Sequence, residues 1–202
     1  MTHVTGTDPM GAHPELYILR HGQTEWNAAG RMQGALDSPL TALGRAQAAR
    51  QGAILGGVGI TQASHDVYVS PQGRARQTAE IALSGIGVVA RIDSRLREIS
   101  LGSYDGLTHD EIEARYPGAF ADADPFLWYD TPPGGEGFAR LQARLGAFLA
   151  DLTRPSVIVA HGMVSLFLRG AVLGLDLDGI AALPGGQGVI YHLKEGVQSR
   201  LT

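Results

Sequence analysis

The chain has 202 residues, of which 44% are hydrophobic and 18% are charged, and its formal net charge is -4. This balance is ordinary for a soluble globular protein, and the length suits one domain with a full-sized core. The acidic balance gives no sign of a basic face for nonspecific nucleic-acid binding, and the absence of cysteine excludes disulfides, thiol catalysis and thiolate metal sites.

The first thirteen residues are polar and contain glycine and proline. This composition predicts a flexible tail at 1–13, followed by a single domain at 14–202. The segment lacks the positive region and the apolar stretch of a signal peptide, and no apolar stretch elsewhere approaches the ~20 residues of a membrane span. We therefore expect a cytoplasmic protein that contacts neither a membrane nor nucleic acid.

The first part of the chain alternates short apolar runs with helical patterns. Thr41 is a candidate helix N-cap, and Thr108 with Glu111 forms a capping-box pattern. In chain order we expect a strand at 15–19, a long loop at 22–39, a helix from Thr41 to about Leu55, a strand at 66–69, a helix at 73–83, a strand at 88–92, and a helix from Thr108 to near Tyr116.

The second part continues the alternation after a loop at 120–137 that is rich in proline, glycine and aromatic residues. Apolar residues then recur at helical spacing from Phe138 to Leu152. A strand at 156–160, a helix at 164–173 and a final strand at 188–194, which can pair with 197–201, complete the pattern. Strands that alternate with helices predict an α/β fold, a three-layer α/β/α sandwich with a mainly parallel central sheet.

Two of the expected buried strands end in the dipeptide His-Gly. His21 and Gly22 follow the first strand, and His161 and Gly162 follow the strand at 156–160. Ligands of open α/β sheets bind at the edge where the parallel strands have their carboxyl ends. The two imidazoles are therefore expected in one pocket at this edge.

Arg20 makes the first of these strand ends the more informative one. An arginine can hold a phosphate through a bidentate, charge-assisted fork. A histidine beside a bound phosphoryl group can act as a nucleophile and form a phosphoenzyme. An isolated His-Gly pair is more often a strand end with a satisfied histidine, so the surrounding residues have to decide between the two interpretations.

Four segments of the sequence distinguish a catalytic histidine from a satisfied histidine at a strand end. They read Leu19-Arg20-His21-Gly22-Gln23-Thr24-Glu25-Trp26-Asn27, Val69-Ser70-Pro71-Gln72-Gly73-Arg74-Ala75, Leu96-Arg97-Glu98-Ile99 and Val159-Ala160-His161-Gly162. In this order they closely resemble the motifs of the histidine phosphatase superfamily, also called the phosphoglycerate mutase-like family. The resemblance extends over roughly residues 15 to 195, and it implies a phosphoglycerate mutase-like sandwich that carries out phosphoryl chemistry.

The resemblance also implies roles for individual residues. His21 would be the nucleophile that becomes phosphorylated, and Glu98 would protonate the leaving oxygen and then deprotonate the attacking water. The residues implied as ligands of the phosphoryl oxygens are Arg20, Arg74, His161 and Asn27. The further residues that the resemblance places at the phosphate or the substrate are Gln23, Thr24, Arg31 and Gly162.

Some of these positions have alternatives. Arg31 can be a ligand or a salt bridge that braces the loop. Arg76 is the alternative to Arg74, but the family pattern has its phosphate ligand directly before Ala-x-x-Thr, which favours Arg74. Asp105 fits a structural turn, and Glu136 fits a carboxylate at a helix start.

The choice between hydrolysis and phosphoryl transfer depends on the aromatic loop. Phosphoglycerate mutases of this family hold a bisphosphate with extra basic residues, whereas the corresponding positions here carry His109 and Pro125-Phe126. The aromatic side chains of Phe126, Trp128 and Tyr129 suit an apolar or ring-containing alcohol better than a second phosphate. We therefore expect phosphomonoester hydrolysis, with mutase-type transfer or a catalytically silent phospho-ligand-binding module as the alternatives.

No cofactor is expected. The seven histidines show no HExxH spacing, and the sequence has no compact aspartate cluster, so the enzyme is predicted to be metal-independent. The expected partner is a small-molecule phosphomonoester, such as a sugar phosphate, a phosphoglycolate-like acid or α-ribazole phosphate. A monomer and a homodimer are both compatible with the sequence.

Overall fold

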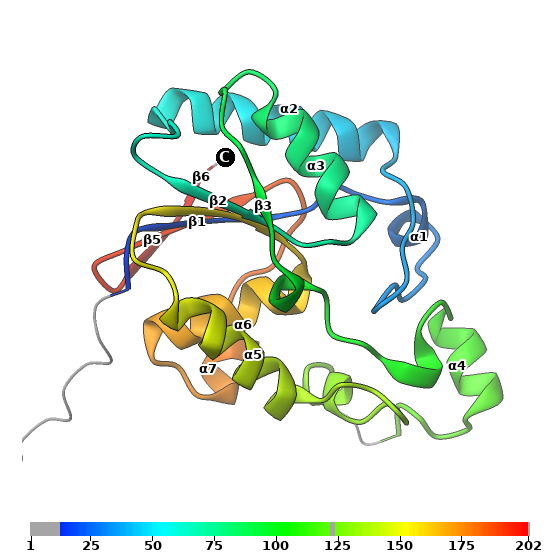
Figure 1. Cartoon of the computed structure of the whole chain (residues 1–202). Coiled ribbons are helices and arrows are strands. Elements are labelled where there is room, and N and C mark those ends of the chain that lie inside the picture. Colours follow the sequence, from blue (N-terminus) through cyan, green and yellow to red (C-terminus); the bar gives the residue numbers. More distant parts are fainter. Residues whose placement is uncertain (1–12, 122–123, 202) are drawn as a thin grey trace, which may run out of the picture.

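The computed structural model describes residues 13–121 and 124–201. The tail expected at 1–13 therefore lies outside the described residues, except for His13. Within the described ranges the strands form a six-stranded sheet in the order β3-β2-β4-β1-β5-β6 (Figure 1). The strands are β1 (Leu16–Arg20), β2 (Asp66–Val69), β3 (Arg91–Ile92), β4 (Ser156–Ala160), β5 (Ile190–Lys194) and β6 (Val197–Leu201).

The sheet is mainly parallel, as predicted. β3, β2, β4 and β1 are parallel to one another, whereas β5 pairs antiparallel with β1 and β6 pairs antiparallel with β5. In the β1–β4 pair, Arg20 lies opposite Ala160. The next residue of each strand is a histidine, so His21 and His161 emerge side by side at one edge of the sheet.

Helices cover both faces of the sheet, which confirms the α/β/α sandwich. Figure 1 shows α2 and α3 on one face and α5, α6 and α7 on the other. Within the described residues no helix combines the length and the apolar character needed to cross a membrane. The helices are α1 (Glu25–Ala28), α2 (Ala42–Val58), α3 (Gly73–Leu83), α4 (His109–Arg115), α5 (Phe138–Ala150), α6 (Gly162–Leu173) and α7 (Leu177–Ala181), with short 3-10 turns η1 (Ser94–Leu96), η2 (Gly102–Tyr104) and η3 (Leu127–Asp130).

The buried core is divided in two by the sheet because successive strand residues point to opposite faces. In β1, Leu16 and Ile18 pack into the core beneath α5 and α6, while Tyr17 and Leu19 pack into the core beneath α2 and α3. Strand β4 is buried at all five positions, and it alternates in the same way. The two central strands are thereby held on both faces, which fixes the positions of the residues that follow them.

The structure moves several predicted boundaries. The strand expected at 88–92 pairs only over β3, and Val89 donates its N–H to the side chain of Gln62 instead of to a neighbouring strand. The strands predicted to begin at 15 and 188 begin at Leu16 and Ile190, and the helix predicted from 164 begins at Gly162. α1 interrupts the loop expected at 22–39, and α7 was not predicted.

Candidate active site

His21 lies where β1 ends and the chain turns away from the sheet. Its backbone N–H donates to the carbonyl of Ala160 (3.0 Å), and the residue is 3% exposed. Its Nδ1 lies 2.7 Å from the carbonyl oxygen of Gly22. Because a carbonyl can only accept, Nδ1 carries the proton and Nε2 keeps its lone pair. The geometry therefore presents Nε2 as the nucleophilic atom.

The turn after His21 depends on two glycines that touch each other. A Cβ on Gly22 would lie 2.2 Å from the carbonyl oxygen of Gly44, and a Cβ on Gly44 would lie 2.0 Å from the carbonyl oxygen of Gln23. Gly44 belongs to the first turn of α2, which Thr41 caps by accepting from the Gly44 N–H (3.0 Å). The close approach of these two backbones fixes the direction in which the chain leaves His21.

Donors without partners surround a cavity of about 100 Å³ beside His21. Arg20 and Arg74 line it, and in the described structure the Nε atom of each is buried without a hydrogen-bond partner. Asn27 also lines the cavity, and its Oδ1 accepts from Gln187 Nε2 (2.6 Å), which leaves its own Nδ2 free to donate. Such a set of cationic and amide donors suits a phosphoryl group.

His161 lies next to His21 but is not among the residues that line this cavity. Its ring centroid is 5.2 Å from that of His21, and it is 0% exposed. Its Nε2 lies 2.7 Å from Ser70 Oγ, whereas its Nδ1 is buried and has no partner within the described part of the chain. If Ser70 donates its hydroxyl proton to Nε2, the Nδ1–H of His161 is free to donate. Ser70 belongs to a quoted motif, but the sequence assigned it no role.

Both histidines are held in the neutral form. Burial, together with the guanidinium groups of Arg74 and Arg20, holds the pKa of His21 well below its usual range. Burial, with the charges of Arg74, His21 and Arg20 next in importance, lowers the pKa of His161 as well. A neutral His21 has the lone pair that a nucleophile needs at neutral pH.

Arg74 is anchored by the loop that precedes α2. Its Nη1 donates to the carbonyl of Leu36 (2.5 Å) and to Asp37 (3.1 Å), and its Nη2 donates to the carbonyl of Gly34 (3.1 Å). The carboxylate of Asp37 also accepts from the backbone N–H groups of Gly73 and Arg74, so it caps α3 from another segment. These contacts engage both Nη atoms, whereas Nε is buried without a partner among the described residues.

Glu98 stands between the phosphate-sized cavity and a second one beside it. Its carboxylate accepts from the backbone N–H groups of Met163 (3.2 Å) and Val164 (3.3 Å) in the first turn of α6, and from its neighbour Ile99 (3.1 Å). The amino end of α6 thus positions the carboxylate. An acid at this place can reach both the leaving oxygen and an attacking water.

Two of the residues expected at the phosphate lie elsewhere. Thr24 caps α1, and the N–H of Asn27 donates to its hydroxyl oxygen (3.1 Å). The side-chain oxygen of Gln23 accepts from the hydroxyl of Thr41 (2.9 Å). Neither Gln23 nor Thr24 lines the cavity beside His21, so both support the loop that carries Asn27.

The other two expected residues lie at the cavity or next to it. Arg31 lines it but forms an ion pair with Glu111 (2.6 Å), which corresponds to the bracing alternative. Gly162 lines the neighbouring cavity, and a Cβ there would come within 3.3 Å of Arg20 Cζ. The small size of Gly162 therefore leaves room for the guanidinium of Arg20.

Two further residues lie at the site: Tyr129, which the sequence associates only with the alcohol part of the substrate, and Gln72, to which the sequence assigns no role. Tyr129 lines the cavity, and burial raises the pKa of its phenol, which therefore keeps its proton. Gln72 links two parts of the site, because its Nε2 donates to the carbonyl of Gly34 (2.9 Å) and its Oε1 accepts from the N–H of Glu98 (2.7 Å). Gln72 lies within a quoted motif, and Tyr129 lies in the aromatic loop.

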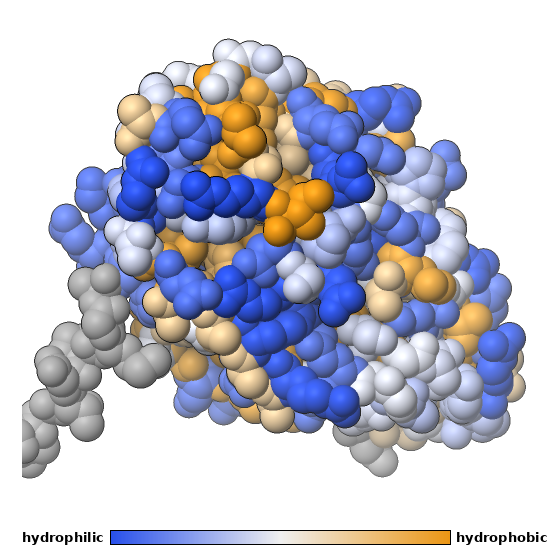
Figure 2. Space-filling view, viewed as in Figure 1, coloured by the Kyte–Doolittle hydropathy of each residue, from blue (hydrophilic) through white to orange (hydrophobic). Residues whose placement is uncertain are grey.

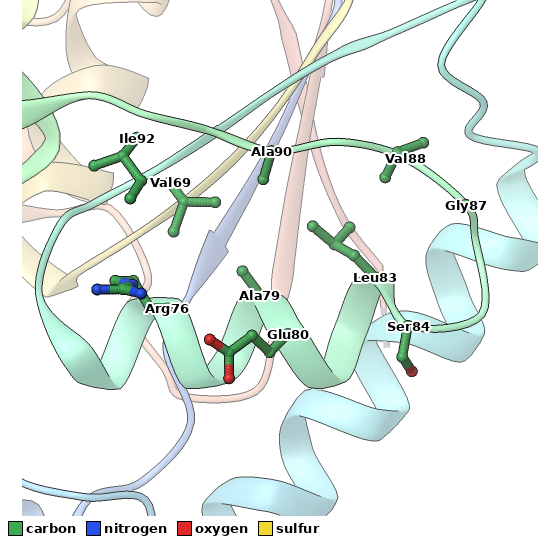
Figure 3. A pocket seen from close by; sticks show the side chains of 10 residues that line it. All are labelled: Val69, Arg76, Ala79, Glu80, Leu83, Ser84, Gly87, Val88, Ala90 and Ile92. Atoms are coloured by element: carbon green, nitrogen blue, oxygen red, sulfur yellow. The ribbon is translucent and has the colours of Figure 1, made fainter.

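Another cavity lies away from this site. It has a volume of about 440 Å³ and lies between α3 and the segment that leads into β3. Figure 3 shows Ala79 and Leu83 of α3 pointing toward Val69 and Ala90, with Arg76 at the same cavity. In Figure 2 hydrophobic atoms gather on this part of the surface. The structure therefore separates Arg76 from Arg74, which lines the cavity beside His21.

The family model of the histidine phosphatase superfamily (branch 1) matches residues 16–198. The chain belongs to this superfamily.

The curated proteins similar to this chain include one named as a phosphatase and one named as a probable mutase. It is 38% identical over 187 residues to a glucosyl-3-phosphoglycerate phosphatase of Mycobacterium tuberculosis, which covers 86% of this chain and 81% of that protein. It is 37% identical over 172 residues to a "Probable phosphoglycerate mutase" of Salmonella newport, which covers 80% of this chain and 75% of that protein.

Solved structures support the same family assignment. A mycobacterial glucosyl-3-phosphoglycerate phosphatase in complex with VO3 has a TM-score of 0.74 and 38% identity, covering 90% of this chain and 92% of that chain. A putative α-ribazole-5'-P phosphatase of Escherichia coli has a TM-score of 0.79 over 94% of this chain and 95% of that chain. Its identity is 23%, so this likeness concerns the fold alone. The histidine phosphatase fold thus extends over nearly all of the described residues.

Proposed function

We propose that the protein is a phosphomonoesterase that hydrolyses a small phosphorylated metabolite through a phosphohistidine at His21. One observation carries this proposal. His21, with an unprotonated Nε2, lines a small cavity together with Arg20 and Arg74, and the Nε atom of each arginine is buried without a partner among the described residues. A phosphoryl group in this cavity would meet a nucleophile and two cations at once.

In the first step Nε2 of His21 attacks the phosphorus atom, and the bond between phosphorus and the alcohol oxygen breaks. Glu98 gives its proton to the departing oxygen, so a neutral alcohol leaves. Arg20, Arg74 and Asn27 donate to the phosphoryl oxygens, over which the transition-state charge is spread. His161, whose ring lies beside that of His21, would contribute its Nδ1–H.

In the second step a water molecule attacks the phosphorus atom of the phosphohistidine. Glu98, now a carboxylate, takes a proton from this water, and the bond between phosphorus and Nε2 breaks. Inorganic phosphate leaves, and both His21 and Glu98 return to their starting forms. The same carboxyl group serves as acid and then as base, which its place between the two cavities allows.

Neither step routes a proton or an electron pair through a metal ion. Among the described residues, no group of three or more histidine, aspartate or glutamate side chains is placed to hold one. We therefore expect hydrolysis to continue in the presence of a chelator.

The test is hydrolysis of p-nitrophenyl phosphate by the wild-type protein in EDTA. His21→Ala should lower kcat by about 10⁴-fold or more, because the nucleophile is lost. His65→Ala is the matched control, since His65 precedes β2 at the opposite end of the sheet and should leave kcat unchanged. Both variants should keep the circular dichroism spectrum of the wild type.

Two further measurements separate the alternatives. Substrate labelled with ³²P, quenched in alkali, should leave label on His21, and its absence would argue against the covalent step. Incubation of 3-phosphoglycerate with 2,3-bisphosphoglycerate should give negligible 2-phosphoglycerate. Efficient mutase turnover would favour phosphoryl transfer, and retention of phosphoester binding without any turnover would favour a silent binding module.

A further inference from the structure

Ser70 is the first residue after β2, at the edge of the sheet where His21 and His161 emerge. Its backbone N–H donates to the carbonyl of Val159 in β4 (3.0 Å), which continues the pairing of the two strands beyond Val69. The residue is 0% exposed. Because the sheet fixes its backbone, the hydroxyl of Ser70 has a defined position beside the end of β4.

Two contacts of this hydroxyl determine where its proton points. Its Oγ accepts from the backbone N–H of Gln72 (3.3 Å), a group that can only donate. The Nε2 atom of His161 lies 2.7 Å from the same Oγ. No other described residue makes a hydrogen bond with Oγ, so Nε2 is the acceptor for the hydroxyl proton. If Nε2–H were the donor instead, a buried hydroxyl proton would have no acceptor, which costs free energy.

His161 depends on this contact because no other hydrogen bond among the described residues selects its tautomer. Burial and the neighbouring charges lower the pKa of its imidazole, so the ring is neutral and carries one proton, on either Nδ1 or Nε2. Its Nδ1 is buried without a partner in the described part of the chain. His21 differs, because the carbonyl of Gly22 (2.7 Å) fixes the proton on its Nδ1.

The position of this proton decides what His161 can do beside a phosphoryl group. With the proton on Nδ1, the ring has a free N–H that can donate to a phosphoryl oxygen. With the proton on Nε2, the free nitrogen carries a lone pair, which repels the same oxygen. The ring centroids of His161 and His21 are 5.2 Å apart, so a phosphoryl group on His21 would lie close to whichever form is present.

We propose that Ser70 is a positioning residue, which holds His161 in the Nδ1–H form by donating its hydroxyl proton to Nε2. Ser70 acts through His161 and does not itself bind the phosphoryl group. Both histidines then carry their proton on Nδ1, with opposite consequences. Nε2 of His21 is left as the nucleophile, whereas Nδ1–H of His161 is left as a donor. This inference rests on the proposed hydrolysis at His21.

Nitrogen-15 NMR of protein labelled at its histidines detects the tautomer directly. His161→Gln removes one imidazole and thereby assigns the resonances of His161. In the wild type at neutral pH, Nδ1 should show the shift of a protonated ring nitrogen and Nε2 that of an unprotonated one. Ser70→Ala should raise the population of the Nε2–H form, so that the two shifts approach each other. Ser70→Thr keeps the hydroxyl and should keep the wild-type pattern.

Steady-state kinetics with p-nitrophenyl phosphate test whether the tautomer matters for catalysis. Ser70→Ala should lower kcat by about 3- to 10-fold, because one hydrogen bond that orients the donor is lost. In the His161→Gln background the same substitution should change kcat by less than about twofold, since a residue that acts through His161 has nothing left to orient. An equal loss in both backgrounds would show that the hydroxyl supports the fold, and it would overturn the inference.

Ser156→Ala is the matched control for the loss of a buried hydroxyl. Ser156 lies at the opposite end of β4, is 1% exposed, and donates its hydroxyl proton to the carbonyl of Arg154 (2.8 Å). Its substitution should leave the shifts of His161 and kcat unchanged. If Ser70→Thr does not fold, as judged by circular dichroism, the wild type and Ser70→Ala decide.

The NMR measurement needs no turnover and therefore separates this inference from the proposed function. Hydrolysis by a wild-type protein in which Nε2 of His161 is protonated, or in which Ser70→Ala leaves the pattern unchanged, would overturn only the inference. An Nδ1–H form that depends on Ser70, in a protein that hydrolyses no phosphomonoester, would overturn only the proposed function.

Discussion

Arg74 and Arg76 lie two positions apart on α3, yet their side chains lie in different cavities. Arg74 is 1% exposed, and its Nε is buried without a partner beside His21. Arg76 lines the cavity between α3 and the segment leading into β3 (Figure 3). Residues two apart on a helix point about 200° apart, which explains the separation. The family motif selected Arg74, and the helix geometry places it at the proposed phosphate site.

Substitution of Arg74 and of Arg76 tests which of the two arginines binds the phosphoryl group. Arg74→Met should lower kcat/KM for p-nitrophenyl phosphate by about 10²- to 10³-fold, because a preorganised donor to the transition state is removed. Arg76→Met removes the same charge from the same helix and should change kcat/KM by less than about threefold. Steady-state kinetics on both variants provide the comparison, and similar losses in the two would contradict the assignment of Arg74.

At the scale of elements, the joint between β1 and α2 shows how a loop is made rigid. The mutual contact of Gly22 and Gly44 leaves no room for a side chain on either residue. The buried side chain of Gln51, one turn before Leu55 on α2, donates to the carbonyls of Arg20 (3.0 Å) and Val189 (3.0 Å). α2 is therefore fastened to the ends of two strands, and His21 lies at the point where they are joined.

Gly22→Ala tests this joint. The added Cβ would meet backbone atoms of Gly44, so we expect a loss of about 2 kcal/mol or more in the free energy of unfolding, as for overpacked sites, with a marked fall in kcat. Gly56→Ala is the matched control within α2, because a Cβ there meets nothing within 4 Å. It should stabilise the protein by about 0.5–1 kcal/mol. Chemical denaturation measures both, and a neutral Gly22→Ala would show that the two backbones can separate.

At the scale of the whole molecule, the two buried histidines make stability depend on pH. Burial holds the pKa values of His21 and His161 well below their usual range. As the pH falls below about 6.5, the unfolded chain binds protons at these positions while the folded protein does not. The free energy of unfolding therefore falls as the pH falls, and it is highest above the usual pKa of histidine.

Denaturation between pH 7 and 5.5 should show this dependence. Each of the two histidines should contribute a slope approaching about 1.4 kcal/mol per pH unit below pH 6.5. His21→Gln should remove one such contribution. Carboxylates whose pKa is lowered in the folded protein, such as Glu15 and Asp93, act mainly below this window. A flat profile in the wild type would mean that these imidazoles become protonated inside the folded protein.

The sequence by itself determined the fold class, and it predicts the central residues of the proposed site. The buried runs of β1, β2 and β4 are local patterns, and β2, α3 and β4 have the predicted bounds. Their His-Gly ends and motif spacing pointed to one pocket, because parallel strands bring their carboxyl ends to the same edge.

Only the tertiary structure decided which other side chains reach that pocket. Thr24 and Arg31 are in the family motif, but a helix cap and the ion pair with Glu111 occupy them. Ser70 contacts His161 across 91 positions of sequence, and Arg169 of α6 donates to the carbonyl of Pro184. Such contacts depend on the packing of distant segments, which no local pattern records.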